Sequence, residues 1–153
     1  MKIRIDIDEN MDEPADEPIV TIRCRTVDDR VVRLQKAMTG ALADDVRIRL
    51  TRDGREYYLP PEDILFFESE GGRTYAHTGG EVFESKLRLY ELEGLLPQSF
   101  IRISKSAIAG TDKIYSIDKN PVGPSTIQFR NSHKKLSVSR QYFKILHDKL
   151  NRE

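Results

Sequence analysis

The feature that most constrains the fold of this chain is a two-residue alternation of apolar and polar side chains, which starts near residue 46 and returns in short runs up to residue 138. In the first run Val46, Ile48 and Leu50 alternate with basic residues, which is typical of a strand with one buried face. Turn residues interrupt the runs, beginning with Asp53-Gly54, a pair that favours a tight hairpin. The pattern predicts a mostly β domain of short strands joined by tight turns.

Turn signals divide this region into a series of expected strands. The pairs Gly71-Gly72 and Gly79-Gly80 each indicate a turn between neighbouring strands. The run from Ile64 to Phe67 is continuously apolar and predicts a buried strand. The expected strands are residues 46–51, 56–59, 64–68, 74–78, 81–84, 100–104, 113–118, 126–130 and 135–138.

Two short helices are expected among these strands, each with large apolar residues on one face. Ser85 is expected to cap the first helix, near residues 86–96, and Ser139 the second, near residues 140–150. Their inward-facing residues are Leu89, Leu92 and Leu96 in the first helix and Phe143, Leu146 and Leu150 in the second. Residues 46–153 are therefore expected to form a domain that is mostly β with short helices, of the α+β class.

The first 45 residues predict a small ββα unit. Alternation indicates strands at residues 2–8 and 19–25, separated by an acidic loop, and Asp28 or Asp29 can cap a helix that ends near Leu42. The helix carries Val31, Leu34, Met38 and Leu42 on one face. So short a unit buries little apolar area alone, so this face is expected to pack on the β domain or on a second copy. The unit is too short for a phospho-acceptor receiver domain.

The composition excludes several classes of protein. The chain has 153 residues, of which 38% are hydrophobic and 33% charged, as expected for one soluble domain. Cys24 is the single cysteine, so neither an internal disulfide nor a cysteine-based zinc site can form. No apolar run approaches the roughly 20 residues of a membrane helix, and the alternating N-terminus does not resemble a signal peptide. These features favour a cytoplasmic protein without membrane insertion.

Charge is segregated along the chain, although the formal net charge is +0. Residues 1–20 hold two Lys/Arg and seven Asp/Glu, whereas residues 100–153 hold eleven Lys/Arg and four Asp/Glu. Such segregation can build a positive field on one region of a neutral protein. Turns and helix ends that simply collect lysine would give the same counts, so the charge pattern alone leaves both interpretations open.

Catalytic motifs are scarce. The chain has no phosphate-binding Gly-rich loop, no Gly-x-Ser-x-Gly elbow and no His-Glu-x-x-His motif. His77, His133 and His147 lie far apart and lack the spacing of metal ligands. Glu68 and Glu70 flank a turn, where a solvated strand end explains them better than an acid–base pair. The sequence therefore predicts no enzyme, no metal site and no cofactor.

Basic residues at turns carry more information. Between Ser99 and Gly110, the residues Arg102, Ser104 and Lys105 alternate with apolar anchors, and such cations and hydroxyls could grip a phosphate backbone. An edge strand with a solvated outer face would show the same pattern. Arg73 directly follows the Gly71-Gly72 turn, so it is expected at a loop tip.

The junction at Ser139-Arg140 places an arginine in the first turn of the last expected helix. The helix dipole does not favour a cation at this position, so Arg140 is a mild indication of an anionic partner. Arginine is also the residue best suited to a bidentate contact with guanine.

Together these features resemble the LytTR-type DNA-binding domain of bacterial transcription regulators. The matching segments follow one another in the family's order and spacing. They are Asp63–Ser69, Leu87–Leu96, Ser99–Ser106 and Leu136–Arg140. The resemblance implies an elongated stack of small β-sheets whose loops enter successive major grooves on one side of bent DNA, without a recognition helix. It also implies a regulator that binds promoter direct repeats in double-stranded DNA as a tandem pair, a homodimer at least on DNA.

Carried over by position, the resemblance also implies roles for individual residues. Arg73 and Arg140 would reach base edges, with Ser139 beside Arg140. Lys105 would contact the intervening backbone or minor groove, with Ser104 and Arg102 beside it. Ser104 stands where a histidine is common in the family, and Ala109-Gly110 replaces a more usual Val-Asn, so the resemblance does not define base preference or the geometry of the strand end.

Regulation and the alternative function depend on the first 45 residues. The family's domain most often follows a receiver domain, whereas here only the ββα unit precedes it. We therefore expect control by a partner, by dimerisation or by abundance rather than by phosphorylation. The alternative is a protein-interaction module that uses the ββα unit as its interface and has lost specific DNA binding.

Overall fold

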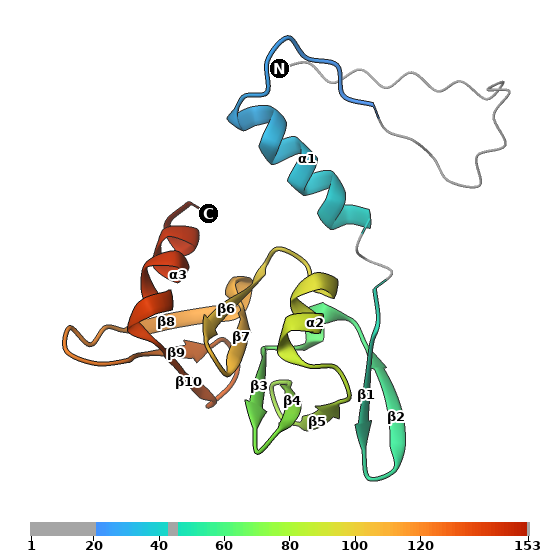
Figure 1. Cartoon of the computed structure of the whole chain (residues 1–153), viewed down its shortest axis with the longest axis vertical. Coiled ribbons are helices and arrows are strands. Elements are labelled where there is room, and N and C mark those ends of the chain that lie inside the picture. The colour runs from blue at the N-terminus through green and yellow to red at the C-terminus, as the bar shows by residue number, and fades with distance from the viewer. Residues whose placement is uncertain (1–20, 43–45, 153) are drawn as a thin grey trace, which may run out of the picture. The chain divides into compact units, whose positions relative to one another are not determined.

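The computed structural model describes residues 21–42 and 46–152 (Figure 1). The chain divides into two units between Gln35 and Lys36. Within the described residues, no helix is long and apolar enough to span a membrane.

The described part of the N-terminal region is a helix preceded by irregular chain. Helix α1 spans Asp29–Leu42, as expected from its apolar spacing. Asp28 caps it, because its Oδ1 accepts hydrogen bonds from the amides of Arg30 at 3.0 Å and Val31 at 3.1 Å. The expected strand at residues 19–25 is wrong over residues 21–25, which are irregular. A short alternating run becomes a strand only beside a partner strand, and no described strand pairs with residues 21–25. The other expected strand, at residues 2–8, lies outside the described residues.

Ten antiparallel strands form two sheets after residue 46. The larger sheet has seven strands in the order β2-β1-β5-β4-β3-β7-β6 and the smaller has three in the order β10-β9-β8. The larger sheet contains β1 (Ile48–Arg52), β2 (Arg55–Leu59), β3 (Phe66–Glu70), β4 (Arg73–His77), β5 (Val82–Ser85), β6 (Phe100–Ser104) and β7 (Ala107–Gly110). The smaller sheet contains β8 (Ile114–Asp118), β9 (Ser125–Phe129) and β10 (Lys135–Val138).

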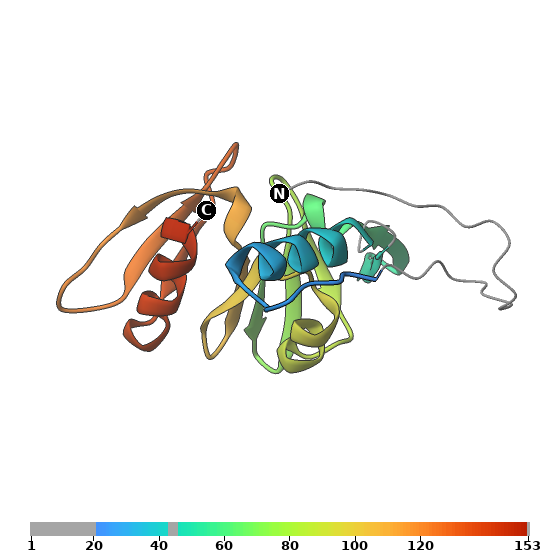
Figure 2. The ribbon, with the colours of Figure 1, turned by 90° about the horizontal axis from the view of Figure 1, so that it is seen from above.

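Helices connect and cover the strands. Helix α2 spans Leu89–Leu95 and α3 spans Arg140–Arg152, with short 3-10 turns η2 at Pro61–Asp63 and η3 at Thr111–Lys113. Figure 2 shows α3 beside the three strands β8, β9 and β10. The prediction of a mostly β domain with helices near residues 86–96 and 140–150 is confirmed.

The glycine-containing hairpins adopt the geometry that their residues favour. Asp53 and Gly54 have φ of 52° and 73°, and Gly71 and Gly72 have φ of 59° and 78°. Two successive positive φ values define the type I′ turn, whose twist matches that of the flanking strands. The turns therefore fix the register of β1 against β2 and of β3 against β4, where Glu70 pairs with Arg73.

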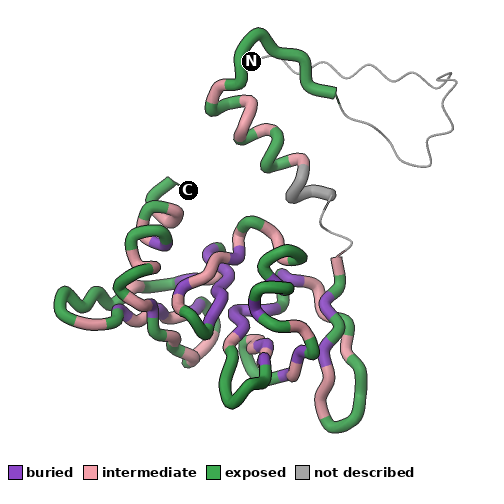
Figure 3. The backbone as a smooth tube through the Cα atoms, in the orientation of Figure 1, coloured by how far each residue is buried: buried purple, intermediate pink, exposed green. Residues whose placement is uncertain are grey.

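The larger sheet is buried on both faces at β7 and at the start of β3, which explains the continuous apolar run before and within β3. Phe67 belongs to the core that α2 covers through Leu89 and Leu92. Its neighbour Phe66 points to the opposite face, where the core includes Phe129 of β9 and the helix α3. Adjacent residues of a strand face opposite sides, so both can be apolar only where both faces are covered. In Figure 3 the buried segments of the chain lie mostly in the strands of the β domain.

The structure corrects three local expectations. Strand β7 was not expected, because Ala107–Gly110 is buried throughout and shows no alternation. Ser85 does not cap α2: its Oγ accepts from the Leu87 amide at 3.1 Å, and the helix begins after Arg88, whose amide donates to Glu91 Oε2 at 2.8 Å. Ser139 holds the cap position of α3 through its carbonyl, which accepts from Tyr142 and Phe143, whereas its Oγ has no hydrogen-bond partner within the described chain.

Candidate nucleic-acid interface

Three loops that carry basic residues meet along one edge of the β domain. The β3–β4 turn lies beside the β6–β7 turn, because the Ser69 amide donates to the Ser106 carbonyl at 2.8 Å. The start of α3 lies beside the end of β6, because the Ser139 amide donates to the Ile103 carbonyl at 3.0 Å. In Figure 1 the β6–β7 hairpin (gold) and the β3–β4 hairpin (green) are neighbours. We call this edge, which carries Arg73, Lys105 and Arg140, the basic edge.

Arg73 is the first residue after the β3–β4 turn. Its side chain is 66% exposed, and Nη1 lies 3.7 Å from Glu84 Oε2 on the neighbouring strand β5. An exposed pair at this distance is weak, so the guanidinium can leave Glu84 for an anionic ligand. The position at a tight turn places the side chain at the rim of the domain.

Lys105 occupies the tip of the β6–β7 turn. It is exposed, and its ammonium makes no hydrogen bond or ion pair with any described residue. The turn itself is ordered: Ser104 Oγ accepts from the Ser106 amide at 3.2 Å and lies 3.4 Å from Ser106 Oγ. A bulge between Arg102 and Ser104 shifts the register of β6, which turns the end of the hairpin, because a bulge bends its strand.

Arg102 lies on β6 and is engaged by the protein itself. Its Nε donates to Glu93 Oε1 at 2.8 Å and its Nη1 donates to the Lys105 carbonyl at 2.9 Å. Its side chain is only 21% exposed. Arg102 therefore differs from the other expected site residues, because its guanidinium donates to acceptors of the protein itself.

Arg140 begins helix α3 and is exposed. No described residue bonds its guanidinium, and the next charge of the helix, Lys144, is also exposed. Ser139 precedes it, half-buried, with its Oγ unpaired. The junction therefore presents a free cation, and the hydroxyl beside it is buried.

A groove of about 390 Å³ joins the β6–β7 turn to the start of α3. It brings together two residues that the sequence analysis singled out and several that it missed. Its polar lining consists of Glu68, Ser104, Ser106, Lys135, Ser137 and Ser139. The missed residues left a signal: Lys135 and Ser137 alternate with apolar residues on β10, so both had to face away from the core.

Glu68 of this groove also belongs to a second set of contacts, which has a different character. Lys134 precedes β10 and donates to the Glu81 carbonyl at 3.0 Å, with its Nζ 3.5 Å from His77 Nδ1. His77 Nε2 lies 2.6 Å from Glu68 Oε1, and its ring stacks on Phe66 with 4.2 Å between centroids. Burial lowers the pKa of His77, an effect that Glu68 opposes and Lys134 reinforces. These groups tie the smaller sheet to the larger one.

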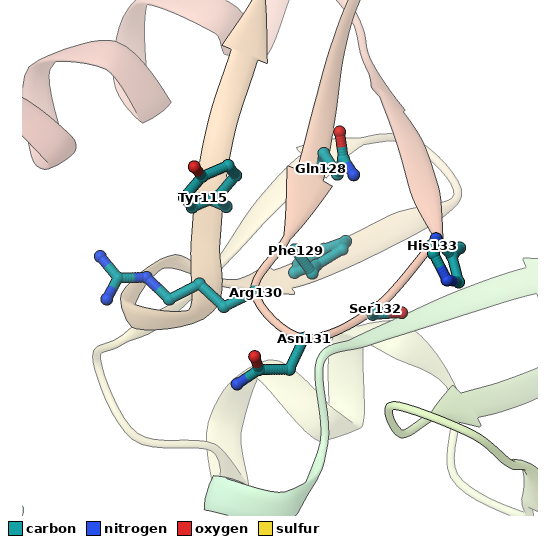
Figure 4. A pocket seen from close by; sticks show the side chains of 7 residues that line it. All are labelled: Tyr115, Gln128, Phe129, Arg130, Asn131, Ser132 and His133. Atoms are coloured by element: carbon teal, nitrogen blue, oxygen red, sulfur yellow. The ribbon is translucent and has the colours of Figure 1, made fainter.

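An open hollow of about 600 Å³ lies beside the β9–β10 loop, lined by Tyr115 and residues 128–133 (Figure 4). Asn131 has a φ of 54° at the tip of this loop, a conformation that asparagine tolerates better than most residues. The hollow holds no set of acid, base and nucleophile, and the described residues contain no cluster of three or more potential metal ligands.

Comparisons with known proteins find similarity across the β domain. The model of the LytTr DNA-binding domain matches residues 54–151. An uncharacterised HTH-type transcriptional regulator of Staphylococcus aureus strain NCTC 8325 is 38% identical over 98 residues, which are 64% of this chain and 66% of the relative. A regulator of the same description from the bovine strain RF122 is 39% identical over 88 residues, which are 58% of this chain and 59% of the relative. The matched part thus spans less than two thirds of each of these relatives, 66% of the first and 59% of the second.

A solved structure shares the fold. The LytTr DNA-binding domain of a putative methyl-accepting/DNA response regulator from Bacillus cereus aligns with a TM-score of 0.64 at 23% identity, covering 69% of this chain and 97% of that domain. Among the described elements, strands separate α1 from α2 and α2 from α3, so no two of these helices form a helix-turn-helix.

Proposed function

This chain belongs to the LytTr DNA-binding domain family, and from that premise we propose that it is a bacterial transcription regulator whose basic edge binds specific duplex DNA. The observation that carries the proposal is the gathering of Arg73, Lys105 and Arg140 at one edge, each exposed. Exposed cations can neutralise successive phosphates or reach base edges without first breaking strong bonds to other groups of the protein.

Roles follow from how each side chain is held. Arg73 at a turn tip and Arg140 at a helix start are the residues we assign to base edges in successive major grooves, since a guanidinium can bond guanine through two donors. Lys105 lies between them along the edge and is assigned to the backbone of the intervening minor groove. Ser104, on the groove between Lys105 and Arg140, supplies a hydroxyl donor for phosphate oxygens, whereas the buried Ser139 Oγ would reach one only after its side chain turns outward.

We further propose that two copies bind a tandem pair of promoter repeats in the cytoplasm. One described N-terminal feature supports pairing: Val31, Leu34 and Met38 lie at helical spacing on α1 and are not fully covered in the single chain. Under this proposal residues 1–45 form an extension through which copies associate, and no catalytic step is involved. Sedimentation of the full chain on duplexes with one repeat and with two repeats tests it; equal stoichiometry on both would contradict it.

The DNA-binding proposal is tested by fluorescence anisotropy with duplex from upstream of the protein's own gene and with a scrambled duplex of the same composition. We expect tighter binding to the upstream duplex and a steep decline of affinity with salt. Equal, weak affinity for both duplexes would contradict the proposal and favour a protein-interaction module.

A further inference from the structure

The side chain of Arg102 bridges two parts of the domain that are distant in sequence. One nitrogen, Nε, donates to Glu93 Oε1 on helix α2 at 2.8 Å, and another, Nη1, donates to the carbonyl oxygen of Lys105 at 2.9 Å. A planar guanidinium holds such donors in a fixed fork, so the two bonds fix each other's direction. The bridge therefore sets the position of the β6–β7 turn relative to α2.

Other bonds secure the neighbours of Lys105 but not Lys105 itself. The Ser106 amide donates to Ser104 Oγ, and the Ser106 carbonyl accepts from the Ser69 amide. Among the bonds of the described residues, the one to the Lys105 peptide carbonyl comes from Arg102. That carbonyl sits at the turn tip, so the bond restrains the Lys105 backbone and with it the direction in which the side chain leaves the chain.

The contrast with the other arginines of the edge is clear from exposure. Arg102 is 21% exposed and engaged at two nitrogens, whereas Arg73 is 66% exposed and has one distant carboxylate. A phosphate contact by Arg102 would require breaking bonds that the free protein already makes.

We propose that Arg102 is a positioning residue: it orients Lys105 for the DNA backbone through the Lys105 carbonyl, is itself oriented by Glu93, and does not touch DNA. The inference rests on the proposed function of Lys105 and reassigns Arg102 within it. Pre-ordering a contact loop strengthens binding because less conformational entropy is lost on association.

A double-mutant cycle separates positioning from direct contact. Arg102→Gln is expected to weaken binding several-fold on both specific and scrambled duplexes, and to cause no further loss in a Lys105→Ala background. A direct phosphate contact would instead give losses that multiply in the double variant. The slope of log affinity against log salt is expected to fall by about one for Lys105→Ala and to stay at the parent value for Arg102→Gln.

Arg102→Lys provides a second discrimination. An ammonium keeps the charge that a phosphate needs but lacks the fork that reaches Glu93 and the Lys105 carbonyl together. Positioning predicts that Arg102→Lys binds DNA as poorly as Arg102→Gln. Recovery of parental affinity by lysine would overturn the inference. Glu93→Gln, which weakens one end of the bridge, is expected to give a smaller loss in the same direction.

A measurement on the free protein tests the positioning role of Arg102 even if Lys105 does not bind DNA. Amide ¹⁵N relaxation is expected to show lower order parameters at Lys105 and Ser106 in Arg102→Gln, and parental values in the matched control Arg73→Gln. If the turn stays as ordered as in the parent, the positioning inference is wrong. If the turn loosens but Lys105→Ala binds DNA like the parent, the inference about order stands and the proposed role of Lys105 fails.

Discussion

The two ends of the β domain use the same kind of residue in opposite ways. Lys105, on the basic edge, is exposed and bonds no described residue. Lys113, in η3, is half-buried; its Nζ donates to the carbonyls of Pro61 and Ile64, each at 3.1 Å, and lies 5.4 Å from the centre of the Phe100 ring. Burial lowers the pKa of Lys113. One lysine is available to a ligand, and the other holds two segments of the protein together.

Lys134 and Lys135 show the same contrast at adjacent positions. Lys134 turns inward to the Glu81 carbonyl, and burial lowers its pKa. Lys135 is exposed and lines the groove that leads to the basic edge. The difference teaches that a count of basic residues overstates the charge available to DNA, because cations with carbonyl partners serve the fold.

Among the substitutions that test this contrast between lysines, we expect the largest effect on the stability of the fold. Lys113→Ala leaves two carbonyls without their charged donor, so we expect the free energy of unfolding to fall by about 3 kcal/mol. DNA affinity, measured where the variant is folded, should stay at the parent value. Urea unfolding checks the first expectation, with the exposed Lys119→Ala as the matched control, expected within about 0.5 kcal/mol of the parent. Equal stability of both variants would contradict the structural role of Lys113.

The next effect is on specific binding. Arg140→Ala removes a proposed bidentate base contact, so we expect a loss of about 2 kcal/mol on the upstream duplex and little change on the scrambled duplex. Stability should change by less than about 0.5 kcal/mol, since Arg140 bonds no described residue. Arg73→Ala is expected to relax specificity at a different base position. If Arg140→Ala weakens both duplexes equally, its base-reading role is wrong.

The adjacent lysines give a sharper and smaller comparison. Lys134→Ala is expected to lower the free energy of unfolding by about 1 kcal/mol through the lost bond to Glu81, with no change in the salt dependence of DNA binding. Lys135→Ala is expected to do the reverse, keeping stability and reducing affinity for both duplexes. Thermal unfolding and anisotropy on the same two variants check both halves. If Lys134→Ala reduced DNA affinity and Lys135→Ala lowered stability, the orientation of the two side chains would be contradicted.

The smallest expected effect is a pH dependence of stability at His77. Its pKa is lowered by burial, so the unfolded chain binds more protons than the folded one. Stability should therefore fall as the pH drops below about 6.5, the ordinary value for histidine. The decline should be shallower in His77→Gln than in the parent, and unchanged in the exposed control His133→Gln. If stability depended on pH identically in the parent and in His77→Gln, this prediction would be wrong.

Local patterns in the sequence predict most of the strands, but they do not predict the contacts that residues at the strand ends make. The turns at Asp53-Gly54 and Gly71-Gly72 are local properties of residues that tolerate positive φ, and the structure has both. Strand β7 escaped prediction because Ala107–Gly110 is buried throughout and shows no alternation. At Gly110 a Cβ would lie 3.3 Å from the Leu65 carbonyl oxygen, a closeness that only the folded sheet reveals.

The candidate site was predictable in position and not in detail. Arg73, Lys105 and Arg140 follow turn or cap signals, so their placement at element ends could be read from the sequence. The bond from Arg102 to Glu93 and those from Lys113 to Pro61 and Ile64 join segments brought together by folding. No local pattern distinguishes a cation with such partners from one without them.

The most direct test of the account is a salt titration of DNA affinity for Lys105→Ala beside Lys113→Ala, at a temperature where both are folded. The account predicts that Lys105→Ala lowers the slope of log affinity against log salt by about one on specific and scrambled duplexes alike, while Lys113→Ala keeps the parental slope. A parental slope for Lys105→Ala, or an equal decrease for Lys113→Ala, would contradict the division between a DNA-binding edge and a structural end.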